Sequence, residues 1–151
     1  MKKAFFPGSF NPFTIGHADI VKRTLRVADI VVIGVGYNLK KPESKDNAGI
    51  RAEQIKEIYR NNKKVEVAVY SGLTVEAVKQ TGSDFIVRGV RNAEDFLNEY
   101  NLAAVNKNIS GIETILMPTD PALSYVSSSM VNELIENGAE EEAKAFLPSK
   151  Q

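Results

Sequence analysis

The sequence alternates between two hydrophobic patterns along its whole length, and no other feature limits the possible folds as strongly. Short apolar runs, such as Ile-Val-Val-Ile-Gly-Val at 30–35, are typical of buried parallel strands. Between these runs, apolar residues recur at the spacing of a helix. We expect strands at 3–6, 30–35, 65–70, 84–87 and 112–117, and helices at 17–26, 50–61, 74–80, 92–108 and 127–137, with a short last helix at 139–146.

Strands that alternate with helices indicate an α/β fold. We expect a doubly wound, five-stranded parallel sheet with helices on both faces, which is a Rossmann-like arrangement. The 151 residues suit one domain, so we expect a single domain over 1–151. In such sheets, ligands bind beyond the carboxyl ends of the strands, where the strand order reverses. The loops after the strands are therefore the place to look for a site.

The composition excludes several other classes of protein. The chain has no cysteine, which excludes disulfides and thiolate metal sites, and no stretch approaches the roughly 20 apolar residues of a membrane span. The stretch 1–6 is too short for a signal peptide. With 19 basic and 19 acidic residues the net charge is zero, which argues against a general nucleic-acid binder. We expect a cytoplasmic protein that binds neither nucleic acid nor membranes.

The loop after the first strand combines several features of a phosphate site. It reads Pro-Gly-Ser-Phe-Asn-Pro-Phe-Thr-Ile-Gly-His at 7–17. Gly8 lets the backbone approach a ligand, Ser9 offers a hydroxyl, and Thr14 can cap the next helix. His17 is the only histidine and falls in the first turn of that helix, where free N–H groups favour phosphate. A lone histidine is more often a surface residue, but here four features converge on one strand end.

Three further loops place cationic or hydroxyl groups after expected strands. Lysine neutralises phosphate as a mobile point charge, arginine forks match phosphate oxygens, and serines at a helix start offer hydroxyls beside free N–H groups. Taken singly, each loop could be a solvated surface segment or a helix cap. The three strings are Lys40-Lys41-Pro42 in a long polar loop over 37–48, Arg88-Gly89-Val90-Arg91, and Leu123-Ser124-Tyr125-Val126-Ser127-Ser128-Ser129.

Together, these motifs resemble those of a known family. Thr-Ile-Gly-His at 14–17 is similar to the T/H-x-G-H signature of the nucleotidyltransferase superfamily. The longer string at 7–17 resembles the opening of bacterial phosphopantetheine adenylyltransferases, and the three later strings match further motifs of that family in order. The chain departs from the family pattern at Asn11, Asn98, Leu123 and the segment 43–49.

The resemblance implies an enzyme of coenzyme A biosynthesis that transfers an adenylyl group from ATP to 4′-phosphopantetheine, giving dephospho-coenzyme A and pyrophosphate. Mg²⁺ would arrive with ATP, and no protein metal site is expected. The expected catalytic residues are Ser9, His17, Lys40, Arg91 and Ser128. The expected acceptor-binding residues are Ser9, Lys40, Thr74 and Arg88. The expected ATP-binding residues are Ser9, Phe10, His17, Gly89, Val90, Arg91, Glu99, Leu123, Ser124, Tyr125, Val126, Ser127, Ser128 and Ser129.

Two other functions remain open on these residues. A nucleotidyltransferase that acts on nicotinate or nicotinamide mononucleotide, or that uses a cytidylyl donor, would share the core, although such relatives usually begin Gly-Gly-[ST]-Phe-Asp. A module that senses ATP without turnover is the other alternative. Separately, the helix at 92–108 has apolar residues on more than one side, which favours burial against a second body. Since the family is hexameric, we expect a homo-oligomer.

Overall fold

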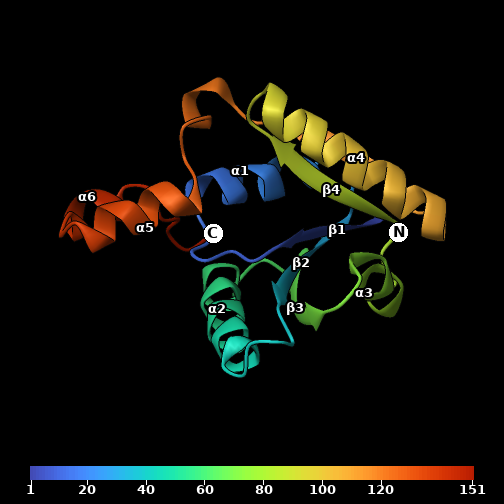
Figure 1. Ribbon diagram of the computed structural model, residues 1–151, viewed down its shortest axis with the longest axis horizontal. Coiled ribbons are helices and arrows are strands. Elements are labelled where there is room, and N and C mark those ends of the chain that lie inside the picture. Colours follow the sequence, from blue (N-terminus) through green and yellow to red (C-terminus); the bar gives the residue numbers. More distant parts are fainter.

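The computed structural model describes residues 1–151, and its elements alternate as the sequence predicts (Figure 1). The strands are β1 (Lys3–Gly8), β2 (Ile30–Tyr37), β3 (Val65–Ser71), β4 (Phe85–Val90) and β5 (Thr114–Pro118). The helices are α1 (Ile15–Thr24), α2 (Ser44–Ile58), α3 (Thr74–Gln80), α4 (Ala93–Ser110), α5 (Ser128–Glu136) and α6 (Glu140–Lys144), with a 3-10 turn, η1, at Pro121–Leu123.

The sheet has five parallel strands in the order β3-β2-β1-β4-β5. The chain winds outward from β1 to β3, crosses back over the sheet to β4, and then winds outward to β5. α1 and α2 pack on one face of the sheet, while α3 and α4 lie on the other (Figure 1). This confirms the doubly wound α/β fold, and it puts the reversal of strand order between β1 and β4.

The central strand β1 is apolar on both faces and contributes to the core on each side of the sheet. Phe5 packs on the side of α3 with Val75 and Val78, and Phe6 packs on the side of α1 and α2. Phe5 also crosses directly over Gly34 of β2, where an added Cβ would lie 2.2 Å from the ring. Glycine is therefore required at this position by packing. The result is a rigid sheet whose carboxyl ends can hold side chains at fixed spacing.

Gly34→Ala tests this packing. We expect the added methyl group to lower the free energy of unfolding by about 1–3 kcal/mol or more, because Phe5 is fully buried and cannot move away. Urea unfolding followed by circular dichroism measures the change. Gly36→Ala in the same strand is the matched control, since its Cβ would meet Tyr70 at an ordinary 3.4 Å. Equal stability of the two variants would contradict the prediction.

Several element boundaries differ from those expected. β4 continues through Arg88, Gly89 and Val90, where a loop was expected, because backbone pairing with β5 extends to Pro118. α2 begins at Ser44 rather than at 50, so the expected polar loop over 37–48 is shorter than predicted. Its first turns bury the small residue Ala48, which carries a weak hydrophobic signal. In addition, α1 begins two residues earlier than expected and β5 begins two residues later.

Candidate active site

Two adjoining cavities open at the carboxyl ends of β1 and β4. The large cavity, of about 1010 Å³, lies between the loop after β2, the start of α3 and the middle of α4. The small cavity, of about 330 Å³, lies between the start of α1, the end of β4 and the start of α5. The two share a wall formed by Pro7, Gly8, Ser9, Arg88 and Glu99. A group held at this wall is therefore accessible from both cavities.

His17 lies in the small cavity and is oriented by a capping box at the start of α1. The backbone N–H of Thr14 donates to His17 Nδ1 at 2.9 Å, and the His17 N–H donates back to Thr14 Oγ1 at 3.4 Å. Because Nδ1 accepts a hydrogen bond, the neutral imidazole carries its proton on Nε2. The same local motif that starts the helix thus presents an Nε2–H donor to a ligand.

The aromatic surroundings of His17 keep its ring neutral. Phe6, Phe10 and Phe13 surround the imidazole, with ring centroids 6.2, 5.0 and 5.4 Å away. Burial, together with the smaller effect of the positive charges of Arg88 and Arg91, lowers the pKa of His17 to about 4. At neutral pH His17 is therefore a hydrogen-bond donor and not a cation or an acid.

This depressed pKa predicts a pH dependence of stability. His17 titrates near 6.5 in an unfolded chain and at about 4 in the folded protein, so the folded state binds fewer protons between these values. The stability linked to neutral His17 is complete above the unfolded pKa and is lost as the pH falls toward the folded pKa. Urea unfolding between about pH 7.5 and about pH 4 should show a shallower loss for His17→Asn than for the natural protein. Parallel curves would contradict this.

The loop between β1 and α1 is held in place by contacts to distant elements. Ser128 Oγ donates to the Pro12 carbonyl at 2.7 Å, and Asn132 Nδ2 donates to the Asn11 carbonyl at 3.0 Å. Phe10 has a φ of 49° although it is not glycine, and its buried ring packs against Gly8, where an added Cβ would lie 2.9 Å away. Gly8 is thus needed for packing against Phe10, in addition to the ligand approach expected from the sequence.

Arg88 in β4 and Arg91 just after it form ion pairs with carboxylates of α4. Arg88 donates from Nε and Nη2 to the two oxygens of Glu99, at 2.8 and 2.7 Å, and from Nη1 to the Pro7 carbonyl. Arg91 donates from Nε to Asp95 Oδ2 at 2.9 Å and from Nη2 to Asp95 Oδ1 at 3.5 Å. These hydrogen bonds hold the pKa of Asp95 below its usual range. Both arginines therefore have defined orientations.

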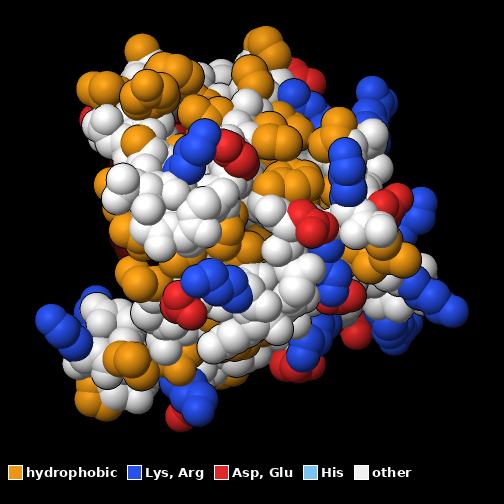
Figure 2. Space-filling view, turned by 90° about the vertical axis from the view of Figure 1, so that its right-hand side faces the viewer, with side chains coloured by type: hydrophobic (Ala, Val, Ile, Leu, Met, Phe, Trp, Pro, Cys, Tyr) orange, Lys and Arg blue, Asp and Glu red, His pale blue; other side chains and the backbone are white.

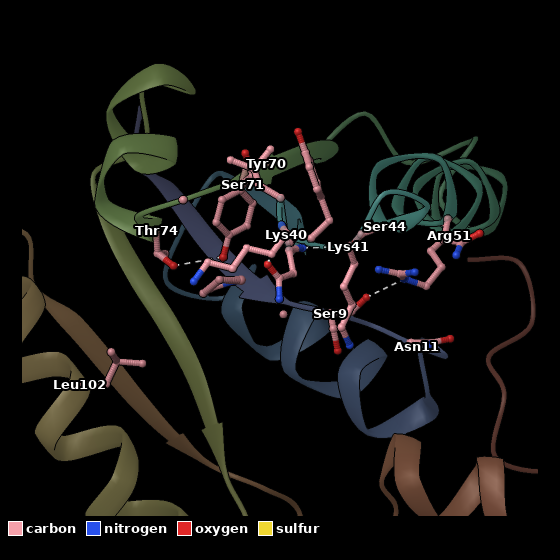
Figure 3. Close-up of a pocket in the computed structure, with 18 of the residues that line it drawn as sticks. Ser9, Asn11, Lys40, Lys41, Ser44, Arg51, Tyr70, Ser71, Thr74 and Leu102 are labelled. Atoms are coloured by element: carbon pink, nitrogen blue, oxygen red, sulfur yellow. Dashed lines mark hydrogen bonds between the residues drawn. The ribbon is translucent and has the colours of Figure 1, made fainter.

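Cationic side chains without carboxylate partners line the large cavity. Lys40, Lys41 and Arg51 make no ion pair. Figure 3 shows Arg51 reaching from α2 to Ser9, where its Nε donates to the Ser9 carbonyl at 2.8 Å. Burial lowers the pKa of Arg51, and its remaining N–H groups are free to bind an anion. This uncompensated charge favours an anionic ligand.

The far side of the large cavity is mixed in character. Tyr70 and Thr74 share a hydrogen bond of 3.0 Å between their hydroxyls, and Leu102 faces them from α4 (Figure 3). In the same lining, Asn106 is buried and the Thr114 hydroxyl is buried without a hydrogen-bond partner. A ligand with both alkyl and amide groups would suit this lining.

The amino-acid sequence is similar to a family model and to several bacterial enzymes. A family model described as cytidylyltransferase-like matches residues 5–134. The phosphopantetheine adenylyltransferase of Porphyromonas gingivalis is 47% identical over 150 residues, covering 98% of this chain and 96% of that protein. The one of Bacteroides fragilis is 42% identical over 152 residues, covering 98% and 97%. The chain belongs to the phosphopantetheine adenylyltransferase family. Membership confirms the resemblance drawn from the four motifs and the enzyme class, a nucleotidyltransferase.

Solved structures share the fold at low sequence identity. A bifunctional NMN adenylyltransferase/ADP ribose pyrophosphatase from Francisella tularensis has a TM-score of 0.69 at 13% identity, covering 99% of this chain and 46% of that one. Its complex with AMP and a manganese ion has a TM-score of 0.61 at 16% identity, covering 91% and 42%. Thermotoga maritima TmcAL bound with alpha-thio ATP has a TM-score of 0.68 at 15% identity, covering 99% and 54%. The chain spans about half the length of these proteins.

Most residues expected from the phosphopantetheine adenylyltransferase motifs line a cavity. Those in the large cavity are Ser9, Lys40, Thr74, Arg88 and Glu99, and those in the small cavity are Ser9, Phe10, His17, Arg88, Gly89, Arg91, Glu99, Val126, Ser127, Ser128 and Ser129. Those that line neither cavity are Val90, Leu123, Ser124 and Tyr125. The hydroxyl of Ser128 is engaged by Pro12, which leaves the start of α5 to offer backbone N–H groups. The individual roles stay predictions.

Several cavity residues were not expected from the sequence. Arg51 lies within a predicted helix and belongs to no motif, so no sequence signal identifies it. Asn106 lies within the expected helix at 92–108 and likewise belongs to no motif. The described chain contains no group of three or more His, Asp or Glu side chains arranged to hold a metal ion. None of its helices combines the length and the apolar content needed to cross a membrane.

Proposed function

We propose that this protein transfers an adenylyl group from ATP to the phosphate of 4′-phosphopantetheine, forming dephospho-coenzyme A and pyrophosphate. The observation that carries the proposal is the wall shared by the two cavities, where Ser9 and Arg88 are accessible from both sides and His17 lies beside them. Two substrates bound in separate cavities could bring their phosphates together at this wall. Family membership supports the same reaction.

The lining of each cavity suits one substrate. The small cavity offers a helix N-terminus at Gly16, the start of α5 at Ser127 and the cation Arg91, which together favour the phosphates of ATP. The large cavity is lined by the cations Lys40, Lys41 and Arg51 and, on its α4 side, by Leu102 and Asn106. The long pantetheine chain, with its amides and methyl groups, would extend along that side while its phosphate stays near Lys40.

The reaction requires no general base. The second pKa of a phosphate monoester is about 6, so the acceptor is mostly dianionic at neutral pH. One of its oxygens attacks the α-phosphorus of ATP, and the bond to the bridging oxygen breaks as pyrophosphate leaves with the electron pair. His17 Nε2–H would donate to an α-phosphate oxygen, and Arg88 with Lys40 would hold the acceptor phosphate. Catalysis is then positioning and electrostatic stabilisation.

Mg²⁺ is proposed to enter as part of the ATP substrate. Magnesium is usually bound through substrate phosphates together with a few carboxylates and waters. The manganese ion in the AMP complex of a solved structure with the same fold supports the use of a divalent cation. We also propose a cytoplasmic location and no nucleic-acid or membrane partner, and the zero net charge supports the absence of a nucleic-acid partner.

Self-association is proposed through α4. Six large apolar residues of this helix are about half exposed or more, which is unusual for one helix of a monomer. Figure 2 shows hydrophobic side chains gathered at the upper edge of the face it views, on the side where α4 lies at the top of Figure 1. The family resemblance suggests a hexamer. Sedimentation at micromolar concentration tests this, and a purely monomeric species would overturn it. The six exposed apolar residues of α4 are Phe96, Leu97, Tyr100, Leu102, Val105 and Ile109.

The decisive experiment measures pyrophosphate release from ATP and Mg²⁺ with three acceptors in parallel: 4′-phosphopantetheine, nicotinamide mononucleotide and nicotinate mononucleotide. Turnover with 4′-phosphopantetheine alone supports the proposal. Turnover with a mononucleotide would leave the ATP site in place and replace the acceptor. Binding of ATP without turnover of any acceptor would favour a sensor.

A further inference from the structure

Helix α2 carries a polar stripe along the side that lines the large cavity. Ser44, Asn47 and Arg51 are spaced three and four residues apart, so they lie on one face of the helix, and all three line this cavity. The small residues Ala48 and Ala52 of the same helix are packed in the core, so this side of α2 faces the sheet. The docking of α2 therefore directs Arg51 into the cavity and not toward bulk solvent.

The Arg51 side chain reaches the wall that the two cavities share. Its Nε donates to the carbonyl of Ser9, a residue that lines both cavities (Figure 3). A guanidinium has five N–H groups, and no other hydrogen bond to protein is made by Arg51, so four of them are free for a ligand. The guanidinium thus lies within one hydrogen bond of the place where the phosphates of two substrates would meet.

The charges on the two sides of this wall differ in their balance. The arginines at the end of β4 are paired with carboxylates of α4. On the α2 side, Lys40, Lys41 and Arg51 have no carboxylate partner, and the one carboxylate in that lining, Glu43, makes no ion pair. Burial also lowers the pKa of Arg51, because its charge is partly withdrawn from water. An unpaired cation in this setting is stabilised by a bound anion.

We propose that Arg51 is a further acceptor-binding residue, whose Nη groups bind the phosphate of 4′-phosphopantetheine while its Nε holds Ser9. Lys40 would bind the same phosphate from the loop after β2, so two cations would face a dianion. A planar fork suits this place because it can bind a carbonyl and a phosphate at once, which an ammonium group cannot do with the same geometry. The identity of the ligand rests on the function proposed above, whereas the contact of Arg51 with Ser9 is present in the protein alone.

The first test compares two ligands that differ only in the phosphate, 4′-phosphopantetheine and pantetheine. Their dissociation constants are measured by NMR titration of the ¹⁵N-labelled full-length protein. Arg51→Gln should weaken 4′-phosphopantetheine binding about 10–100-fold, as expected for the loss of one or two charge-assisted hydrogen bonds. It should change the binding of pantetheine, and of a non-hydrolysable ATP analogue, less than about twofold.

Arg60→Gln is the matched control. Arg60 follows α2, pairs with Glu57 on the surface and lines neither cavity, so the binding constants of this variant should equal those of the natural protein. Equal losses of 4′-phosphopantetheine and pantetheine binding in Arg51→Gln would show that Arg51 only shapes the cavity, and would overturn the proposal. A loss confined to the ATP analogue would assign Arg51 to the nucleotide and would also overturn it.

The second test uses the natural protein, so it does not depend on the folding of a variant at this position. The Nε–H resonance of Arg51 should shift on saturation with 4′-phosphopantetheine or with inorganic phosphate, and should not shift with pantetheine. If the natural protein binds neither acceptor, the proposed function fails, while the titration with inorganic phosphate still decides the anion site. A saturable shift of the Arg51 resonance supports that site, and an unchanged resonance overturns it.

Discussion

Replacing His17 with alanine should lower kcat about 10²–10³-fold, the usual effect of removing one oxyanion donor. The capping box leaves the Nε2–H of a neutral imidazole free in the small cavity, where charge would develop on the α-phosphate in the proposed reaction. An interaction that strengthens in the transition state affects kcat more than substrate affinity. Steady-state rates of pyrophosphate release, with ATP affinity measured separately, test this. Turnover close to that of the natural protein would remove His17 from the reaction.

His17→Asn is the control that separates the two roles of this side chain. An asparagine Oδ1 can accept from the Thr14 N–H and so preserve the helix cap, but it has no group at the position of Nε2. We expect the asparagine variant to retain the start of α1 and to lose activity nearly as alanine does. If asparagine restores activity, the cap rather than the donor explains the alanine defect.

Replacing Arg88 with lysine should lower kcat/KM for the acceptor about 10²-fold. Lysine keeps the positive charge but cannot contact Glu99, the Pro7 carbonyl and a phosphate at once with a planar fork. Two charge-assisted hydrogen bonds to the phosphate would be weakened, each worth about 1.5–3 kcal/mol. Because Arg88 lies on the wall shared by both cavities, the loss should appear mainly as a higher KM for 4′-phosphopantetheine.

Lys79→Arg serves as a control for the exchange of basic residues, since Lys79 lies on the exposed side of α3 and pairs only with Glu76. Its kinetic constants should match those of the natural protein. If Arg88→Lys raises KM for ATP and leaves KM for the acceptor unchanged, Arg88 belongs to the nucleotide and not to the acceptor.

The strand and helix pattern was predictable because each element carries its own periodicity. β2 is a continuous β-branched run, and buried parallel strands require such runs on both faces. The start of α2 was missed because its first turns contain Lys45, Asp46 and Gly49 and bury only the small Ala48. The end of β4 was missed because Arg88 and Gly89 read as loop residues, whereas pairing with β5 keeps them in the sheet.

Parts of the site were also predictable, where the contacts are local. The orientation of His17 depends on Thr14, three residues away, so the short string Thr-Ile-Gly-His contains both the donor and the residue that aims it. Ser127 similarly caps the helix that it begins, α5. The family resemblance added the order of the motifs, and the curated relatives confirmed that resemblance.

The sequence alone was sufficient for the α/β class, the parallel sheet and the motifs at the strand ends, because periodicity and capping act over a few residues. The sequence could not show that Arg51 donates to the Ser9 carbonyl or that Glu99 pairs with Arg88. It also could not show that two cavities share one wall. Those contacts join segments that are far apart in the chain or lie on different elements. They exist only after strand register and helix docking set the distances between side chains, and no short-range pattern encodes that geometry.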